Sequence, residues 1–288
     1  MHIASLIARP GHLDPALVEA LRNALGGGTA DWLSPDEAAE FPLQTLPGNI
    51  EDIRRSIAEQ ADLNIVPAQN RRKALLIADM DSTMIEQECI DELAEEAGVG
   101  AHVKDITARA MNGELDFEGA LTERVALLKD QPETVIQRVI DTRITLMPGG
   151  RALVSTMKAN GAHAALVSGG FTAFTSRIAD MLGFDENRAN TLLTDDGVLT
   201  GQVGMPILGR DAKVSALEEI TASLGKTPDD AIAVGDGAND LGMLGLAGLG
   251  VALHAKPTVQ AQCDLRVNHG DLTALLYLQG YARADFQS

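Results

Sequence analysis

The sequence has few aromatic residues and fewer basic residues than acidic ones. Phe, Trp and Tyr make up 3% of its 288 residues, which leaves few rings on which the bases of a single-stranded nucleic acid could stack. It has 23 Lys and Arg against 41 Asp and Glu, and a surface with the resulting formal net charge of −18 repels phosphate backbones. We therefore expect no nucleic-acid partner.

Long apolar runs and paired cysteines are also lacking. Apolar stretches such as 74–78 fall far short of the ~20 residues that a membrane-spanning helix needs, and residues 1–7 do not resemble a signal peptide. The two cysteines, Cys89 and Cys263, do not have the paired spacing of a metal site and are expected to be reduced thiols. These features predict a cytoplasmic protein with no membrane partner. Since 45% of the residues are hydrophobic, the chain can still bury a core, which excludes wholesale disorder.

Residues 1–70 predict a small α+β unit. The strands and helices expected in it are, in chain order, a strand at 2–8, helices at 15–25 and 49–60, and a strand at 63–66. A βαββαβ-like order fits this pattern and resembles the ferredoxin-like modules of the ACT type. We expect this module to have a structural role or to form a homodimer, with Trp32 and Phe41 in its core.

Four short apolar runs follow, and each ends in a polar cluster; they cover residues 74–78, 164–167, 231–234 and 249–253. Runs without alternation are what strands buried on both faces require, so we expect a parallel sheet covered by helices. Helical patterns alternate with these runs, which predicts a doubly wound α/β fold; they cover residues 151–160, 172–182, 211–224 and 240–247. Ligands of such sheets bind beyond the carboxyl ends of the strands, where the polar clusters lie.

Between residues 87 and 146 the pattern is helical, with little sign of a strand. A helical insertion directly after the first strand would stand over the carboxyl edge of the sheet as a cap, which can exclude water and select substrates. We therefore expect a module at 1–70, a helical cap at 87–146, and a core formed by 71–86 and 147–288.

The densest polar cluster, Asp79-Met80-Asp81-Ser82-Thr83, follows the first apolar run. Residues i and i+2 of an extended segment point the same way, so Asp79 and Asp81 are expected to face one site. Two converging carboxylates repel each other unless a proton or a cation relieves them, and Mg²⁺ takes oxygen ligands of this kind. A lone Asp-x-Asp is more often a turn or a helix cap, so the hypothesis depends on the other strand ends.

Three further clusters offer groups that suit a phosphate and its counter-ion. Asp236, within Gly235-Asp236-Gly237-Ala238-Asn239-Asp240, supplies another carboxylate, and the glycines allow close backbone approach. Ser168-Gly169-Gly170 offers a hydroxyl and unhindered N–H groups to phosphate oxygens. Lys213 can neutralise phosphate charge. Taken singly, the Ser-Gly-Gly segment is usually a loop and such a lysine a surface residue.

Together, and in this order, these motifs resemble those of the haloacid dehalogenase superfamily of aspartate-nucleophile phosphatases, from about residue 73 to the end of the sequence. The resemblance implies that Asp79 is the nucleophile and that Asp81 is the general acid and base. It also implies one Mg²⁺ per active site, held by Asp79, Asp236 and the main-chain carbonyl of Asp81. The residues expected to bind the phosphoryl group are Ser168, Gly169, Lys213 and Asn239. Asp240 is expected to orient Lys213 or a metal-bound water.

The first motif and the cap resemble those of phosphoserine phosphatases in particular, through residues 79–94, 111–117 and 121–125. This resemblance assigns Glu88 to the ammonium group of the substrate and Arg124 to its carboxylate. Enclosing a zwitterion is costly unless each charge meets an opposite partner, and an Arg can hold a carboxylate through two parallel hydrogen bonds. The implied reaction is hydrolysis of O-phospho-L-serine to L-serine and phosphate through an aspartyl-phosphate, the last step of L-serine biosynthesis.

Three other functions remain open. A phosphotransferase that delivers the phosphoryl group to an alcohol such as homoserine would have nearly the same motifs. A signalling receiver domain also uses a parallel sheet, an acidic Mg²⁺ pocket and a Lys. Asp81 and the helical insertion argue against it, because the phospho-aspartate of a receiver must persist. A non-catalytic amino-acid sensor is suggested only by the N-terminal module.

Overall fold

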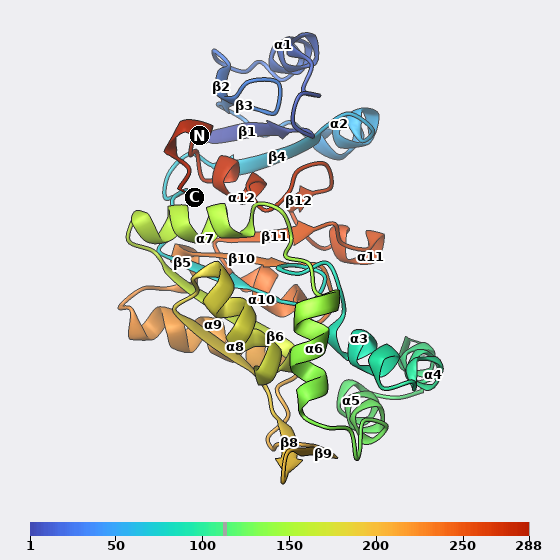
Figure 1. Cartoon of the computed structure of the whole chain (residues 1–288). Coiled ribbons are helices and arrows are strands. Elements are labelled where there is room, and N and C mark those ends of the chain that lie inside the picture. Colours follow the sequence, from blue (N-terminus) through green and yellow to red (C-terminus); the bar gives the residue numbers. More distant parts are fainter. Residues whose placement is uncertain (112–113, 288) are drawn as a thin grey trace.

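The computed structural model describes residues 1–111 and 114–287. An antiparallel sheet occupies the N-terminal end (Figure 1), with the strand order β2-β3-β1-β4. Its elements are β1 (His2–Ile7), α1 (Pro15–Ala24), β2 (Asp31–Ser34), β3 (Ala38–Leu43), α2 (Ile50–Ile57) and β4 (Asp62–Pro67). Both helices pack on one face of the sheet, against Leu6, Phe41 and Leu63. The chain order of these elements is the βαββαβ order that the sequence predicts.

A parallel sheet of six strands forms the centre of the molecule, in the order β12-β11-β10-β5-β6-β7. Its strands are β5 (Leu75–Ala78), β6 (His163–Phe171), β7 (Glu186–Asn190), β10 (Ala231–Gly235), β11 (Leu249–Leu253) and β12 (Leu265–Val267). The four apolar runs of the sequence are its four inner strands. The edge strands β7 and β12 were not predicted, because a strand with one neighbour is less buried and carries a weaker apolar signal.

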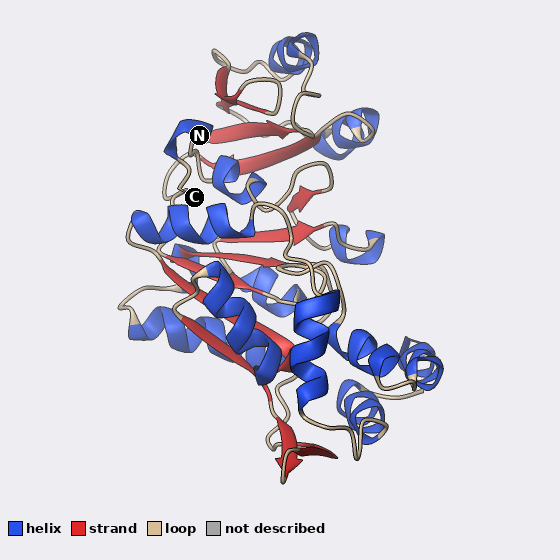
Figure 2. Cartoon of the chain, in the orientation of Figure 1, coloured by secondary structure: helices blue, strands red, loops and turns tan. Residues whose placement is uncertain are grey.

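Helices cover both faces of this sheet (Figure 2). Successive residues of a strand point to opposite faces, so Leu75 and Leu76 belong to different cores. The face of Leu76 packs against α7 (Gly150–Ala159), α8 (Thr172–Leu182) and α12 (Ala274–Leu278). The face of Leu75 packs against α9 (Arg210–Ser223), α10 (Leu241–Leu246) and α11 (Pro257–Gln260). The described residues also form two short 3₁₀ turns, η1 (Pro228–Asp230) and η2 (Arg283–Asp285).

The helical insertion lies between β5 and α7, at one end of the molecule (Figure 1). It consists of α3 (Cys89–Glu96), α4 (Gly100–Met111), α5 (Phe117–Ala126) and α6 (Thr134–Arg143). Helix α5 contacts a two-stranded hairpin, β8 (Leu192–Asp195) and β9 (Val198–Val203), which the sequence analysis did not predict. Residues 112 and 113 of the predicted cap motif lie outside the described residues.

The predicted fold class is confirmed: a doubly wound α/β core with a helical insertion after its first strand and a small additional α+β unit. The expected core position of Trp32 was wrong. It lies on β2, the outer edge strand, and its side chain is 37% exposed, whereas Phe41 is fully buried. Among the described residues, every helix is too short or too polar to span a bilayer.

Candidate active site

The predicted polar clusters meet at the carboxyl edge of the six-stranded sheet, around a cavity of about 420 Å³. Asp79 directly follows β5, Ser168 lies within β6 and Asp236 directly follows β10. These three strands are adjacent and parallel, so their carboxyl ends lie at one edge. The predicted site residues that line the cavity are Asp79, Asp81, Glu88, Arg124, Ser168, Gly169, Asp236 and Asn239.

The buried carboxylate of Asp79 is held through one of its two oxygens. Its Oδ1 accepts a hydrogen bond from the N–H of Met80 at 2.8 Å and lies 2.7 Å from the ammonium nitrogen of Lys213. Within the described residues, no hydrogen bond engages its Oδ2. Burial raises the pKa of Asp79 well above its ordinary value, and the charge of Lys213 opposes this shift. The carboxylate is therefore fixed in place with one oxygen available.

Asp79, Asp236 and Asp240 form a carboxylate cluster whose ligand atoms all lie within 4.8 Å of one another. The Lys213 ammonium contacts two of them, at 2.7 Å from Asp79 and 2.5 Å from Asp240. Burial alone would lower the pKa of Lys213, but these two carboxylates outweigh it and raise that pKa, so the ammonium stays charged. Burial and the charge of Asp240 raise the pKa of Asp236 to about 6. An excess of carboxylate oxygens over positive charge fits a divalent cation.

The carboxylates of Asp240 and Asp81 are each held by two hydrogen-bond donors. Asp240 accepts hydrogen bonds from Lys213 through Oδ1 and from the N–H of Gly237, at 3.0 Å, through Oδ2, so it positions both groups. The Asp81 carboxylate lies outside the cluster and accepts from the N–H of Cys89 at 2.8 Å and the hydroxyl of Ser168 at 3.2 Å. Burial raises the pKa of Asp81, which favours the protonated form that a general acid requires.

Both glycines of the Ser-Gly-Gly segment at the end of β6 lie close to other side chains of the site. A Cβ atom at Gly170 would lie 2.7 Å from Oδ2 of Asp81, and one at Gly169 would lie 3.1 Å from the ring of Phe117 in the cap. The N–H of Gly170 donates to the hydroxyl of Ser168 at 2.8 Å. Asn190, at the end of β7, holds the segment by donating to the carbonyl of Gly169 at 2.8 Å.

The insertion brings two opposite charges to the cavity. Glu88 directly precedes α3, and its carboxylate accepts a hydrogen bond from the hydroxyl of Ser82 at 2.7 Å. Arg124 lies in α5, and its Nε donates to the carbonyl of Ala120 at 3.2 Å. Glu88 is exposed to solvent on one side, and on the other the desolvation caused by the surrounding protein atoms, followed by the charge of Asp81, raises its pKa to about 7.

A family model of haloacid dehalogenase-like hydrolases matches residues 76–245. This segment is more than half of the chain and contains Asp79, Ser168, Lys213 and Asp236. The chain belongs to the haloacid dehalogenase-like hydrolase family. The resemblance inferred from the sequence is thereby confirmed.

Curated relatives of this hydrolase are named phosphoserine phosphatase. The relative from Archaeoglobus fulgidus is 44% identical over 243 residues, which are 82% of this chain and 70% of the relative. The relative from Polaromonas sp. is 49% identical over 209 residues, which are 71% of this chain and 89% of the relative. Against the 40% identical protein from Streptomyces coelicolor, the match covers 88% of this chain but 63% of the relative.

Solved structures share the fold of this hydrolase. A haloacid dehalogenase family hydrolase from Salmonella enterica superposes with a TM-score of 0.88 at 31% identity, covering 96% of this chain and 97% of the other. A probable phosphoserine phosphatase from Vibrio cholerae gives 0.80 at 34% identity, covering 99% and 88%. A structure described as a phospho-aspartyl intermediate analogue of phosphoserine phosphatase gives 0.66 at 42% identity, covering 72% and 98%.

The structure also adds residues that the sequence analysis did not single out. Thr83 donates a hydrogen bond to Asp236 at 3.3 Å. Thr83 belongs to the first motif, and its hydroxyl next to the two aspartates was the sequence signal for a contact with a carboxylate. Asn190 gave no such signal, because β7 itself was not predicted. Lys256 and Thr258 line the cavity from the segment after β11. Their position among the polar residues after the fourth apolar run was the sequence signal that could have identified these two residues.

Proposed function

We propose that this protein is a phosphoserine phosphatase that hydrolyses O-phospho-L-serine to L-serine and phosphate with Mg²⁺. The observation that carries the proposal is the cavity itself. It contains a buried aspartate at the metal-type carboxylate cluster and, on the cap side, one carboxylate and one guanidinium for the charges of an amino acid. The 40–49% identity to proteins named phosphoserine phosphatase supports the same substrate.

Asp79 performs the first step as the nucleophile. Its free carboxylate oxygen attacks phosphorus, a new oxygen–phosphorus bond forms, and the bond between phosphorus and the serine oxygen breaks. Asp81 is protonated before this step and gives its proton to the departing serine oxygen. The products of the step are serine and an aspartyl-phosphate on Asp79.

Asp81 then acts as the general base in the second step. Its carboxylate accepts a proton from the water that attacks the phosphorus of the aspartyl-phosphate, which releases phosphate and restores Asp79. The hydrogen bonds from the N–H of Cys89 and the hydroxyl of Ser168 hold Asp81 in place for both proton transfers.

The remaining groups bind and neutralise the phosphoryl group. Mg²⁺ would be held by Asp79, Asp236 and the main-chain carbonyl of Asp81, and when bound it supplies positive charge to the phosphoryl oxygens. The protein groups that would bind these oxygens are Ser168, Gly169, Lys213 and Asn239. Asp240 holds the ammonium group of Lys213 in place through an ion pair of 2.5 Å.

Phosphate release from phosphoserine tests the proposal. We expect activity with Mg²⁺ and loss of it with EDTA, because removing the cation leaves the carboxylates of the site uncompensated. We also expect p-nitrophenyl phosphate and phosphothreonine to be poorer substrates, since the first lacks the charges that Glu88 and Arg124 bind and the second adds a methyl group. Equal activity on all three would contradict the substrate assignment, and transfer to added homoserine would support a phosphotransferase.

The pKa of Glu88 predicts a pH dependence of substrate binding. Because this pKa is raised to about 7, the free protein loses the Glu88 charge as the pH falls from 8 to 6. A neutral Glu88 cannot pair with the substrate ammonium, so KM for phosphoserine is expected to rise over this range. Steady-state kinetics measures the effect, and Glu88→Gln should remove it. The same rise in KM with p-nitrophenyl phosphate, which has no ammonium, would contradict this role.

Other predictions from the sequence stay proposals. We propose that residues 1–70 form an ACT-like module that mediates a homodimer, with the cap at 87–146 and the core in the rest of the chain. A cytoplasmic location and the absence of nucleic-acid and membrane partners remain predictions from composition. Light scattering of the full chain would test the dimer.

A further inference from the structure

Lys256 lies on the wall of the catalytic cavity and has no role in the reaction described above. It follows β11 and directly precedes α11, and its exposed side chain lines the cavity beside Thr258. Since β11 pairs with β10, Lys256 reaches the cavity on the side of Asp236. Across the described ranges, no ion pair engages its ammonium.

The cavity has more negative than positive charge, which an anionic substrate must overcome. The carboxylates that line it are those of Asp79, Asp81, Glu88 and Asp236. The cationic groups that line it are Arg124 and Lys256, and Lys213 behind the wall is already shared by two carboxylates. A phosphoserine molecule with a doubly ionised phosphate is itself a net anion, and the whole chain has a formal charge of −18. Arg124 is assigned to the substrate carboxylate, and buried Lys213 to the phosphoryl group once it is bound. Lys256 is an exposed cation on the cavity wall, so it can attract the phosphate of a substrate that is still approaching.

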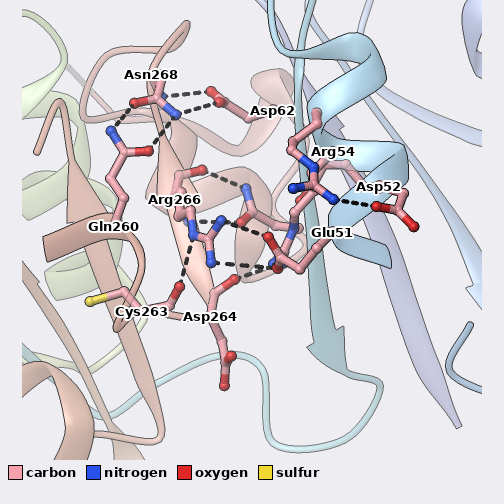
Figure 3. Close-up of polar contacts among 12 residues, drawn as sticks. Glu51, Asp52, Arg54, Asp62, Gln260, Cys263, Asp264, Arg266 and Asn268 are labelled. Atoms are coloured by element: carbon pink, nitrogen blue, oxygen red, sulfur yellow. Dashed lines mark hydrogen bonds and ion pairs between the residues drawn. The ribbon is translucent and has the colours of Figure 1, made fainter. Parts of the chain in front are cut away.

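A chain of hydrogen bonds runs from Asp62 of the N-terminal sheet through Asn268 to Gln260 (Figure 3), and Gln260 continues it to the segment of Lys256. Asp62 of β4 accepts from the backbone N–H of Asn268 at 2.8 Å and from its side-chain amide at 3.1 Å. The side-chain oxygen of Asn268 accepts from Nε2 of Gln260 at 2.8 Å. The same Nε2 donates to the carbonyl of Ala255 at 2.7 Å, one residue before Lys256.

Further contacts join the N-terminal unit to β12. The side chain of Asn64 in β4 accepts from the backbone N–H of Arg266 in β12 and donates to its carbonyl, both at 2.8 Å, as a neighbouring strand would. The guanidinium of Arg266 pairs with Glu51 of α2 at 3.0 Å (Figure 3). The N-terminal unit therefore holds β12 and Asn268, and Asn268 is linked through Gln260 to the segment between β11 and β12, which lines the catalytic cavity.

We propose that Lys256 is a further substrate-recruiting residue of this site, and that the Asp62–Asn268–Gln260 chain from the N-terminal unit holds its segment at the cavity. Lys256 attracts the phosphate group of the incoming substrate and does not take part in the chemical steps. The N-terminal unit thereby contributes to catalysis without supplying a residue to the cavity. This inference rests on the phosphatase function proposed above.

The test compares Lys256→Gln with the intact protein on phosphoserine and on p-nitrophenyl phosphate. We expect kcat/KM to fall by about 5- to 10-fold at low ionic strength on both substrates, since both carry the phosphate, with kcat nearly unchanged. The difference should shrink as salt is added, because salt screens exposed charges beyond about 10 Å at 0.1 M. Lys256→Arg, which keeps the charge, should restore most of the loss.

The matched control is Lys226→Gln. Lys226 is also exposed, but it lies between α9 and η1, which leads into the amino end of β10, away from the carboxyl ends that form the cavity. Its replacement should leave kcat/KM unchanged. Equal effects of the two variants, or a loss confined to kcat, would overturn the inference while an active intact protein would still support the phosphatase function. An intact protein inactive on phosphoserine would instead overturn the proposed function.

A double-mutant cycle tests the hydrogen-bond chain. Gln260→Ala removes the link between Asn268 and Ala255, and we expect it to raise KM by a smaller factor than Lys256→Gln does. In the Lys256→Gln background the same change should have no further effect on KM, because the ammonium that it positions is absent. Independent, multiplicative effects would show that Gln260 does not act through Lys256.

Discussion

We expect the Asp79→Asn variant to release phosphate from phosphoserine at least on the order of 10⁴-fold more slowly than the intact protein, as for other enzymes that lose a nucleophile. The amide is nearly isosteric with the carboxylate and can keep the hydrogen bond from the N–H of Met80. It is a far weaker nucleophile and a weaker cation ligand, so neither the attack on phosphorus nor the cation site survives. A malachite-green assay of released phosphate measures the loss.

The control for this variant is Asp195→Asn. Asp195 is an exposed acid at the end of β8, outside the catalytic cavity, and its replacement should leave turnover unchanged. Circular dichroism of both variants checks that the fold is kept. Substantial Mg²⁺-dependent turnover by a folded Asp79→Asn protein would show that another group attacks phosphorus.

The second large effect is expected for Asp81→Asn, which should slow turnover of phosphoserine by roughly 10²- to 10⁴-fold, the usual range for a general acid or base. The amide oxygen can keep the hydrogen bond from the N–H of Cys89, which Oδ1 accepts, while the NH₂ group takes the place of Oδ2 beside the hydroxyl of Ser168. The amide cannot exchange a proton. Both steps of the reaction lose their proton transfer. Steady-state kinetics under saturating substrate measures the effect on kcat.

The choice of leaving group separates the two steps in this variant. Nitrophenolate leaves without protonation, so with p-nitrophenyl phosphate the first step should remain fast while hydrolysis of the aspartyl-phosphate stays slow. We expect a burst of about one nitrophenolate per active site and a protein heavier by one phosphoryl group in mass spectrometry. The intact protein serves as the control and should show no burst. Unchanged steady-state turnover, or a burst that does not label the protein, would contradict the role of Asp81.

Much of the core and of the candidate site could be predicted because both depend on local sequence. Strands buried on two faces must be apolar throughout, and each must end where polar residues begin, so the inner strands and the residues at their carboxyl ends, Asp79, Ser168 and Asp236, are visible in the sequence. The edge strand β7 and the hairpin of β8 and β9 follow no such rule. Their residues are half exposed, and their pairing depends on neighbours that lie elsewhere in the chain.

The sequence determined some features of this protein, and the tertiary structure decided others. The sequence by itself determined the doubly wound core, the helical insertion and the polar residues at the carboxyl ends of the inner strands, because strands buried on both faces are apolar throughout and end where polar residues begin. It did not determine that Asp240 completes the carboxylate cluster, or that Asn190 holds Gly169. Nor did it place Lys256 beside the catalytic site on a segment tied to the N-terminal sheet. These contacts join residues that are distant in sequence, so distances and hydrogen-bond partners exist only once the strands and helices have packed.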